Sequence, residues 1–257
     1  MDNLLDGKVA IVTGSGAGIG EAIARAFAAE GARLVISDID ADRAHHVAES
    51  LPDALAVQCD VSDETQVMSM VDQAMEHYGA VHVMVPNAGV TGISALTEMS
   101  YAEWRRVTSV NLDGVFLSIR YAAPAIIASG GGTIVTISSI TSTGGSALIA
   151  HYAASKAAVR NLTETASVEL GPLGVRINAL LPGYLGTALV HDAVPGFEQA
   201  GQMVEGTLVP FLESKQGGRL GTVEEVATAA VFFASDQSSF CNGSSLVLDG
   251  GLVASLL

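Results

Sequence analysis

The sequence predicts an α/β fold, a doubly wound parallel sheet with helices on both faces. Seven short apolar segments are predicted as strands, and the first, Lys8–Val12, lacks the in/out alternation of a half-exposed strand, as is typical of a strand buried on both faces. Helical segments with one apolar face lie between them, so we expect right-handed crossovers from strand to strand. No linker, repeat or low-complexity tract interrupts the 257 residues, and we predict a single domain over residues 1–257.

Strands and helices are expected to alternate along the chain. In the first helical segment Ile19, Ile23 and Phe27 recur on one face, and Gly31 stands where it would end the helix. The segment 67–78 shows the same periodicity and is followed by another glycine. The predicted strands are residues 8–12, 33–37, 56–59, 81–85, 132–138, 175–181 and 245–248.

Two later helices are indicated by their first turns. The segments Ser100-Tyr-Ala-Glu103 and Thr222-Val-Glu-Glu225 have the capping-box pattern, in which a hydroxyl and a carboxylate close the turn reciprocally. We therefore interpret their acidic residues as caps and not as a catalytic pair. Residues 188–218 are rich in Gly and Pro, and a long loop of this kind predicts a lid or substrate-binding segment.

Composition and charge exclude several functions. The chain has 12 Lys+Arg against 27 Asp+Glu, and a net charge of −15 disfavours nucleic acid and anionic membranes as partners. A hydrophobic content of 49% excludes a disordered chain. Cys59 and Cys241 form neither a disulfide framework nor a zinc motif, and the histidines show no metal spacing, so we predict no metal site. The first residues lack the features of a targeting signal, and we expect a cytoplasmic protein.

A glycine-rich turn follows the first predicted strand. The segment Thr13–Gly20 fits T-G-x-x-x-G-x-G, which lets the backbone approach a pyrophosphate at the N-terminus of the next helix. Asp38 ends the second strand, where a carboxylate accepts hydrogen bonds from ribose hydroxyls and repels a 2′-phosphate. Ser15 and Ile39 flank this site without positive charge, which favours NAD over NADP. The alternatives are a purely structural turn and a solvated carboxylate at a strand end.

The segment Tyr152-Ala-Ala-Ser-Lys156 places a phenol and an ammonium at i and i+4 on one helix face. A cation beside the phenol favours phenolate, and moving the pKa from about 10 to about 7 requires about 4 kcal/mol. Such a pair also arises by chance in many helices. Ser139 adds weight to the functional interpretation, because it ends a buried strand at the sheet edge where α/β proteins bind ligands.

With these motifs in order, the chain resembles the short-chain dehydrogenase/reductase superfamily in its single-domain form of about 250 residues, over nearly the whole length. The resemblance implies a Rossmann-type fold with NAD as cofactor. It assigns Tyr152 as general acid/base, Lys156 as the residue that lowers the tyrosine pKa and binds the nicotinamide ribose, and Ser139 as the partner of the substrate oxygen. It also assigns Asn111, in Val110-Asn-Leu-Asp-Gly114, as the anchor of a water path, although this residue could instead only distort its helix.

The same resemblance implies the binding residues. Asn87-Ala-Gly89 and Pro182-Gly-Tyr-Leu-Gly-Thr187 match motifs beside the cofactor, and Asp60 matches the contact to adenine. The implied cofactor-binding residues are Gly14, Ser15, Gly18, Ile19, Gly20, Asp38, Ile39, Asp60, Val61, Asn87, Ala88, Gly89, Tyr152, Lys156, Pro182, Gly183, Leu185 and Thr187. The implied substrate-binding residues are Ser139, Thr141, Ile149, Tyr152, Tyr184 and Leu189, with Val90, Thr91, Leu185 and parts of 190–215 near them.

These residues predict an NAD-dependent oxidoreductase for a neutral, moderately hydrophobic secondary alcohol or ketone, of cyclic, aryl-alkyl or steroid-like type. One alternative is an NADPH-dependent 3-oxoacyl-carrier-protein reductase, which Asp38 and the acidic surface disfavour because the carrier protein is itself acidic. Another is a non-catalytic dinucleotide sensor, which would not need Tyr152 and Lys156. A homotetramer is expected by analogy, and His151 is left open between a pocket residue and a subunit contact.

Overall fold

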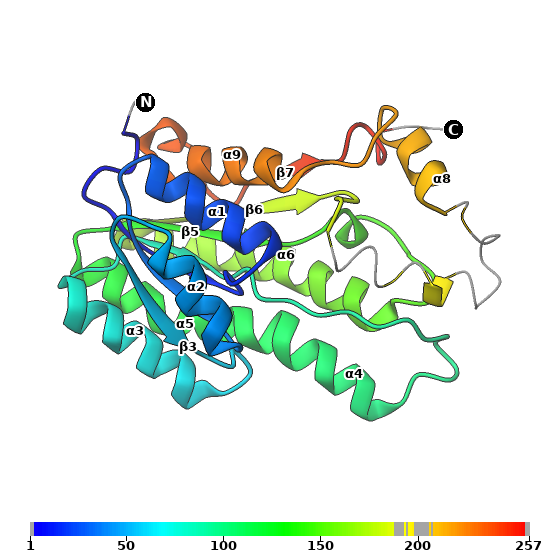
Figure 1. Ribbon diagram of the computed structural model, residues 1–257, viewed down its shortest axis with the longest axis horizontal. Coiled ribbons are helices and arrows are strands. Elements are labelled where there is room, and N and C mark those ends of the chain that lie inside the picture. Colours follow the sequence, from blue (N-terminus) through cyan, green and yellow to red (C-terminus); the bar gives the residue numbers. More distant parts are fainter. Residues whose placement is uncertain (1–2, 188–192, 194, 198–205, 207, 255–257) are drawn as a thin grey trace.

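The computed structural model describes residues 3–187, 193, 195–197, 206 and 208–254. Its centre is a seven-stranded, all-parallel sheet in the order β3-β2-β1-β4-β5-β6-β7, which confirms the predicted fold class (Figure 1). The strands are β1 (Val9–Thr13), β2 (Arg33–Asp38), β3 (Ala54–Gln58), β4 (Val83–Val85), β5 (Gly132–Ile137), β6 (Val175–Pro182) and β7 (Ser245–Leu248). The helices are α1 (Gly18–Ala29), α2 (Ala41–Glu49), α3 (Glu64–Tyr78), α4 (Tyr101–Thr108), α5 (Gly114–Ala128), α6 (Ala150–Leu170), α8 (Leu208–Lys215) and α9 (Val223–Ala234).

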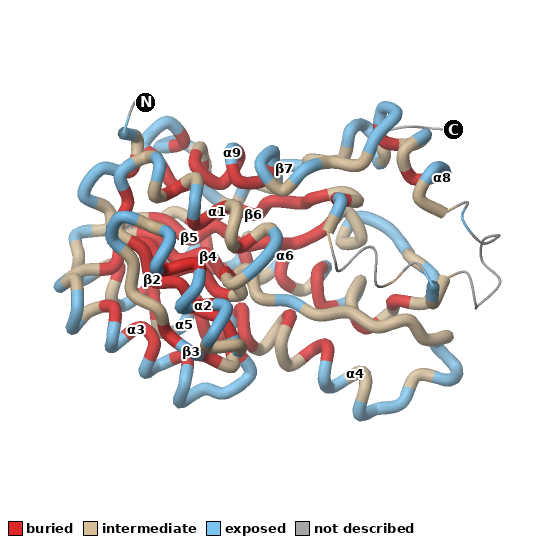
Figure 2. Tube along the Cα trace, viewed as in Figure 1, coloured by how far each residue is buried: buried red, intermediate tan, exposed pale blue. Residues whose placement is uncertain are grey.

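Successive strand residues enter two different cores. Ala10 and Val12 of β1 pack with buried residues of α1, α2 and α9, whereas Ile11 packs on the other face with α3, α5 and α6. Both faces of the central strands are therefore covered, and the buried residues concentrate in the sheet (Figure 2). This two-sided burial explains why the strand segments are uniformly apolar in sequence.

The strand order reverses between β1 and β4, which are neighbours although β2 and β3 lie between them in the chain. In open α/β sheets ligands bind in the crevice outside the carboxyl ends of the strands at such a point. The glycine turn follows β1 and Asn87 follows β4 closely, so both lie at this crevice.

The helical run 101–128 differs from a plain helix. A π-helical turn, Ser109–Asp113, separates α4 from α5, and Pro124 lies inside α5. By length and composition this run is apolar enough to cross a membrane, but half of the window lies buried inside the fold, as in the core helix of a soluble protein.

Only one of the two predicted capping boxes forms in full. Thr222 and Glu225 cap α9 reciprocally. At α4 the hydroxyl of Ser100 accepts from the N–H of Glu103 at 3.1 Å, but the carboxylate of Glu103 lies beside His151 instead of closing the box. The prediction that Glu103 acts as a cap is therefore wrong, because a tertiary neighbour competes for its carboxylate.

Candidate active site

The turn between β1 and α1 permits close approach to its backbone. Gly14 and Gly18 have φ angles of 61° and 60°, a left-handed conformation that favours glycine. A Cβ on Gly14 would lie 2.8 Å from Ala88 Cα, and one on Gly20 would lie 2.5 Å from Asn87 Nδ2. The residue before α1 offers no side-chain cap, so the first N–H groups of the helix are left to bind an anion.

The segment 87–89 fastens this turn to β4. Asn87 Nδ2 donates to two main-chain oxygens at the end of β1 at 2.8 and 3.1 Å. The N–H groups of Asn87 and Ala88 donate to Thr13 Oγ1 at 3.0 and 3.2 Å. Gly89 follows, and a Cβ there would lie 3.7 Å from Lys156 Nζ. The segment thus connects the glycine turn with the lysine of the predicted site.

Asp38 is 9% exposed and faces the glycine turn. Its carboxylate accepts the N–H of Gly16 at 3.0 Å and that of Asp40 at 3.1 Å. Arg43, in the first turn of α2, lies on the same side: its Cβ would be 2.6 Å from a Cβ on Gly16, and its guanidinium pairs with Asp40 at 3.3 Å. The expectation that no positive charge lies near this carboxylate is therefore wrong, because α2 folds back over the turn.

Ser139 and Tyr152 meet at the carboxyl end of β5. Ser139 follows the strand in an extended conformation, and Tyr152 lies in the first turn of α6. Their side chains share a hydrogen bond. Ser138, one residue earlier, donates to the main-chain oxygen of Lys156 at 2.8 Å and fastens α6 to the strand. The sheet edge and the helix thereby fix the serine and the tyrosine together.

Lys156 lies beside the Tyr152 ring and is held by a main-chain oxygen. Its Nζ donates to Ile137 O at 2.8 Å and lies 5.6 Å from the centre of the Tyr152 ring. Burial raises the pKa of Tyr152 to about 12, against a smaller lowering by the Ser139 hydrogen bond. Burial also lowers the pKa of Lys156 to about 8. Burial therefore dominates the pKa of Tyr152 here, and the predicted lowering of this pKa by Lys156 stays a prediction.

Asn111 is fully buried in the π-helical turn between α4 and α5. Its Oδ1 accepts from Val90 N at 2.8 Å and its Nδ2 donates to Val90 O at 2.9 Å. A Cβ on Gly89 would lie 3.5 Å from Asn111 Oδ1. Asn111 thus lies in distorted helix and also holds the segment beside Lys156, and its role as the anchor of a water path stays a prediction.

A cavity of about 90 Å³ opens above Ser139 and Tyr152. Among the described residues that line it, the only ionisable side chains are Tyr152 and Tyr184. Thr141 Oγ1 is buried there without a hydrogen-bond partner among the described residues. Of the four predicted substrate residues besides Ser139 and Tyr152, Thr141, Ile149 and Tyr184 line the cavity, and Leu189 lies outside the described residues. Further lining residues are Thr91, Ile140, Gly183, Ala193, Phe197, Leu208 and Leu212.

Comparison with known proteins decides the family. A family profile described as "Enoyl-(Acyl carrier protein) reductase" matches residues 14–253. Cyclohexanol dehydrogenase of Acinetobacter sp. (strain SE19) is 39% identical over 255 residues, 97% of this chain and 96% of that protein. A short-chain type dehydrogenase/reductase from Mycobacterium marinum superposes with a TM-score of 0.90 at 34% identity, covering 99% of this chain and 98% of that one. The chain belongs to the short-chain dehydrogenase/reductase family.

The protein is therefore an oxidoreductase of alcohols or ketones, and its family implies a nicotinamide dinucleotide as cofactor. The relatives do not decide between the two forms of that cofactor. Gluconate 5-dehydrogenase from Burkholderia cenocepacia J2315 was solved in complex with NADP and tartrate, and it has a TM-score of 0.90 at 35% identity, covering 99% of this chain and 98% of that one.

Two residues that were predicted to bind the dinucleotide make contacts within the fold of this short-chain dehydrogenase/reductase. Ser15 is fully buried; its N–H donates to Ser37 O at 2.9 Å and its hydroxyl donates to Val12 O at 2.7 Å. Leu185 is 4% exposed, packs in the core around α1 and α9, and bridges to Gly221. Both residues hold their segments to the sheet, and their contact with the dinucleotide stays a prediction.

The other predicted cofactor residues lie along the carboxyl edge of the sheet. Asp60 Oδ1 accepts from the N–H and hydroxyl of Ser62 at 2.9 and 2.7 Å, which orients its carboxylate. Val61 is buried, Ile39 is 63% exposed, and Ile19 lies in the first turn of α1. Pro182 ends β6, and Gly183 and Thr187 follow it.

Sequence reasoning missed Gln216, which follows α8 directly. Gln216 is 4% exposed; its Nε2 donates to Tyr184 O at 2.8 Å and its Oε1 accepts from Tyr184 N at 2.7 Å. A Cβ on Gly183 would lie 2.5 Å from Gln216 Oε1, so this close approach requires glycine. In the sequence, Gln216 is an amide near the end of the Gly- and Pro-rich region 188–218. The residue spacing does not indicate that its partner is Tyr184.

Proposed function

We propose that the protein is an NAD-dependent dehydrogenase of neutral, moderately hydrophobic secondary alcohols, with cyclic alcohols as the leading class, and that it reduces the corresponding ketones in the reverse direction. The observation that carries the proposal is the hydrogen-bonded pair of Ser139 and Tyr152 beneath a cavity whose described lining residues include no Asp, Glu, Lys or Arg. The cyclohexanol dehydrogenase relative supports a cyclic alcohol.

The residues divide the work on the substrate oxygen. Ser139 donates a hydrogen bond to that oxygen and stabilises the negative charge that develops on it. Tyr152 takes the hydroxyl proton during alcohol oxidation and returns it during ketone reduction. Lys156 and Asn111 hold the floor of the site through Ile137 O and Val90. When bound, the nicotinamide dinucleotide supplies the hydride acceptor for oxidation and the hydride donor for reduction.

The protonation state of Tyr152 sets the direction of the pH dependence. Its raised pKa of about 12 keeps the phenol protonated near neutrality, which suits proton donation to a ketone. Alcohol oxidation needs the phenolate, whose fraction increases as the pH rises toward that value. We therefore expect oxidation to accelerate with pH and ketone reduction to slow in strongly alkaline solution.

The first turn of α1 and the residues around it fit a dinucleotide. The glycine positions leave no room for side chains where the backbone would approach a pyrophosphate. The Asp38 carboxylate suits ribose hydroxyls and repels a 2′-phosphate, which is the argument for NAD. Arg43 is the competing feature, since a guanidinium beside this site attracts a 2′-phosphate; its pairing with Asp40 favours NAD.

A substrate panel tests the proposal. The purified protein is assayed by NADH or NADPH absorbance with cyclohexanol, 1-phenylethanol, a hydroxysteroid and gluconate, each with NAD⁺ and NADP⁺. We expect turnover of the neutral alcohols, with kcat/KM at least about tenfold higher for NAD⁺. Turnover confined to gluconate would contradict the substrate class, and equal use of both cofactors would contradict the role of Asp38.

Two alternatives remain distinguishable. The family profile bears the description of an acyl-carrier-protein reductase, and a 3-oxoacyl-carrier-protein reductase would reduce an acetoacetyl thioester with NADPH. The net charge of −15 disfavours docking of an acidic carrier protein. A non-catalytic sensor would bind NADH without turning over any alcohol or ketone of the panel. By analogy we also propose a cytoplasmic homotetramer, which sedimentation of the purified protein and cell fractionation test.

A further inference from the structure

His151, directly before the catalytic tyrosine, is fully buried and is not used by the mechanism above. Its Nδ1 accepts the main-chain N–H of Tyr152 at 2.8 Å. The residue before α6 provides no side-chain cap, so this bond satisfies an N–H of the first helical turn that has no partner within the helix. The imidazole thus holds the backbone of the residue that carries the proton.

The second nitrogen of the ring is oriented by a carboxylate. Because Nδ1 accepts a hydrogen bond, the neutral ring carries its proton on Nε2. Nε2 is buried without a hydrogen-bond partner among the residues that the structure describes, and it lies 3.6 Å from Oε1 of Glu103, whose side chain is 28% exposed. This is the carboxylate that the capping box of α4 leaves free.

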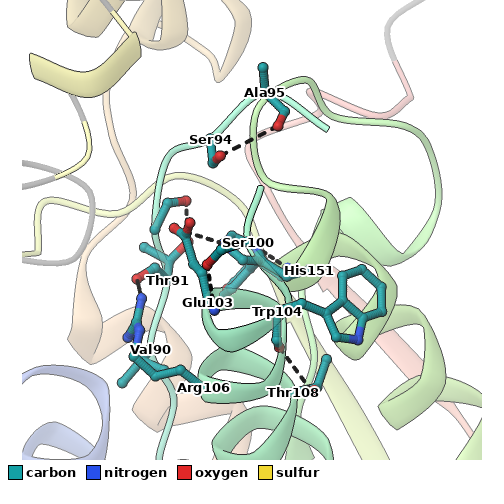
Figure 3. A network of polar contacts seen from close by, with 12 residues as sticks. Val90, Thr91, Ser94, Ala95, Ser100, Glu103, Trp104, Arg106, Thr108 and His151 are labelled. Atoms are coloured by element: carbon teal, nitrogen blue, oxygen red, sulfur yellow. Dashed lines mark hydrogen bonds and ion pairs between the residues drawn. The ribbon is translucent and has the colours of Figure 1, made fainter. Parts of the chain in front are cut away.

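Three side chains of this group surround Gly92. A Cβ on Gly92 would lie 2.6 Å from Glu103 Oε1, 3.2 Å from Arg106 Nη2 and 3.3 Å from His151 Nε2. Figure 3 shows the contact between Glu103 and His151. Arg106 Nη2 donates to Thr91 O at 2.9 Å, and Thr91 lines the cavity. We call Gly92, Glu103, Arg106 and His151 the His151 cluster.

We propose that His151 and Glu103 are positioning residues for the reaction: His151 fixes the backbone of Tyr152, and Glu103 orients the ring of His151. The cluster brings together α4, the segment after β4 and the first turn of α6. One end touches the residue that transfers the proton, and the other touches the wall that places the alcohol. This inference rests on the proposed role of Tyr152.

Two amide variants separate the contacts of the ring. In His151→Asn the amide oxygen stands near the position of Nδ1 and still accepts the Tyr152 N–H, but the side chain does not reach Glu103. In His151→Gln the amide nitrogen reaches the Nε2 position, but the acceptor beside Tyr152 is lost. His151→Leu removes both contacts. We expect kcat for alcohol oxidation to fall about tenfold in the Leu and Gln variants and to recover to within about threefold in the Asn variant.

Three further measurements exclude a merely structural effect. The NADH dissociation constant, from fluorescence titration, is expected to stay within about twofold in all variants. In a double-mutant cycle, Glu103→Ala lowers kcat of the wild type but adds little to His151→Leu, because the two residues act as a unit. The matched control is Glu98→Ala, which removes an exposed carboxylate just before α4. We expect it to leave kcat unchanged.

Amide hydrogen exchange keeps the test independent of turnover. We expect exchange of the Tyr152 amide to accelerate in His151→Leu and His151→Gln but not in His151→Asn. Equal kcat and equal exchange in the Asn and Gln variants would overturn the proposal, and so would additive effects of His151 and Glu103. If the wild type oxidised no alcohol, the proposed function would fail, whereas the exchange experiment would still decide whether His151 holds Tyr152.

Discussion

Replacement of Lys156 by methionine is expected to abolish activity and yet to stabilise the protein near neutral pH. Lys156 is 4% exposed, and burial lowers its pKa from 10.5 to about 8. A shift of about 2.5 pH units corresponds to about 3 kcal/mol, the amount by which burial of the charged ammonium disfavours the folded chain. Leaving Ile137 O without its donor costs about 1–2 kcal/mol, so the net gain in Lys156→Met is about 1–2 kcal/mol.

The sign of this effect changes with pH. Below pH 8 the folded and the unfolded chains both hold the lysine proton, and the burial cost is present in full. Between pH 8 and 10.5 only the unfolded chain holds it, so the free energy of unfolding of the wild type rises with pH. The methionine variant lacks this rise, and the order of stability is expected to invert between pH 7 and pH 10.

Urea unfolding at pH 7, 8, 9 and 10 measures this difference. Trp104, the one tryptophan of the chain, reports unfolding by its fluorescence. Lys156→Arg is the matched control, because it retains a charge that cannot be neutralised in this range. A methionine variant that is less stable than the wild type at every pH, by a constant amount, would refute the reasoning.

Three other substitutions test separate parts of the site. Asp38→Ala is expected to raise KM for NAD⁺ about tenfold to a hundredfold and to narrow the preference for NAD⁺ over NADP⁺. Replacement of the exposed Asp42 by alanine is the control and changes neither quantity. Both are measured by steady-state kinetics with the two cofactors, and an unchanged cofactor preference in Asp38→Ala would exclude the ribose contact. Gln216→Leu removes both hydrogen bonds to the Tyr184 main chain and is expected to raise KM for the alcohol about fivefold, with a smaller effect on kcat. Unchanged kinetics would show that these two hydrogen bonds are dispensable for activity. Thr141→Val removes a buried hydroxyl that has no hydrogen-bond partner among the described residues, so we expect the free energy of unfolding in urea to rise by about 1 kcal/mol; a destabilised variant would contradict this.

The sequence predicts the sheet and the reacting residues because both depend on local patterns. Uniformly apolar strands and the periodicity around Phe27 determine the layers, and the spacing of Tyr152 and Lys156 follows from one helical turn. The boundaries were less predictable: β3 begins at Ala54, two residues before the expected start, and β4 covers only Val83–Val85.

Features that depend on tertiary contacts could not be predicted. The Glu103 carboxylate leaves its helix turn for His151, Arg43 folds back beside Asp38, and Gln216 binds the backbone of Tyr184. In each case residues far apart in the chain, or on different elements, compete with a local partner. The pKa of Tyr152 is of the same kind, since the amount of burial decides it and the sequence shows only the neighbouring lysine.

The most direct test of the account is the turnover of Tyr152→Phe. The variant keeps the ring and the packing but lacks the hydroxyl that shares a hydrogen bond with Ser139. We expect kcat with NAD⁺ and cyclohexanol to fall by about three orders of magnitude, while the NADH dissociation constant and the urea midpoint stay close to wild type. Near-normal kcat in this variant would contradict the assignment of Tyr152 as the group that carries the proton.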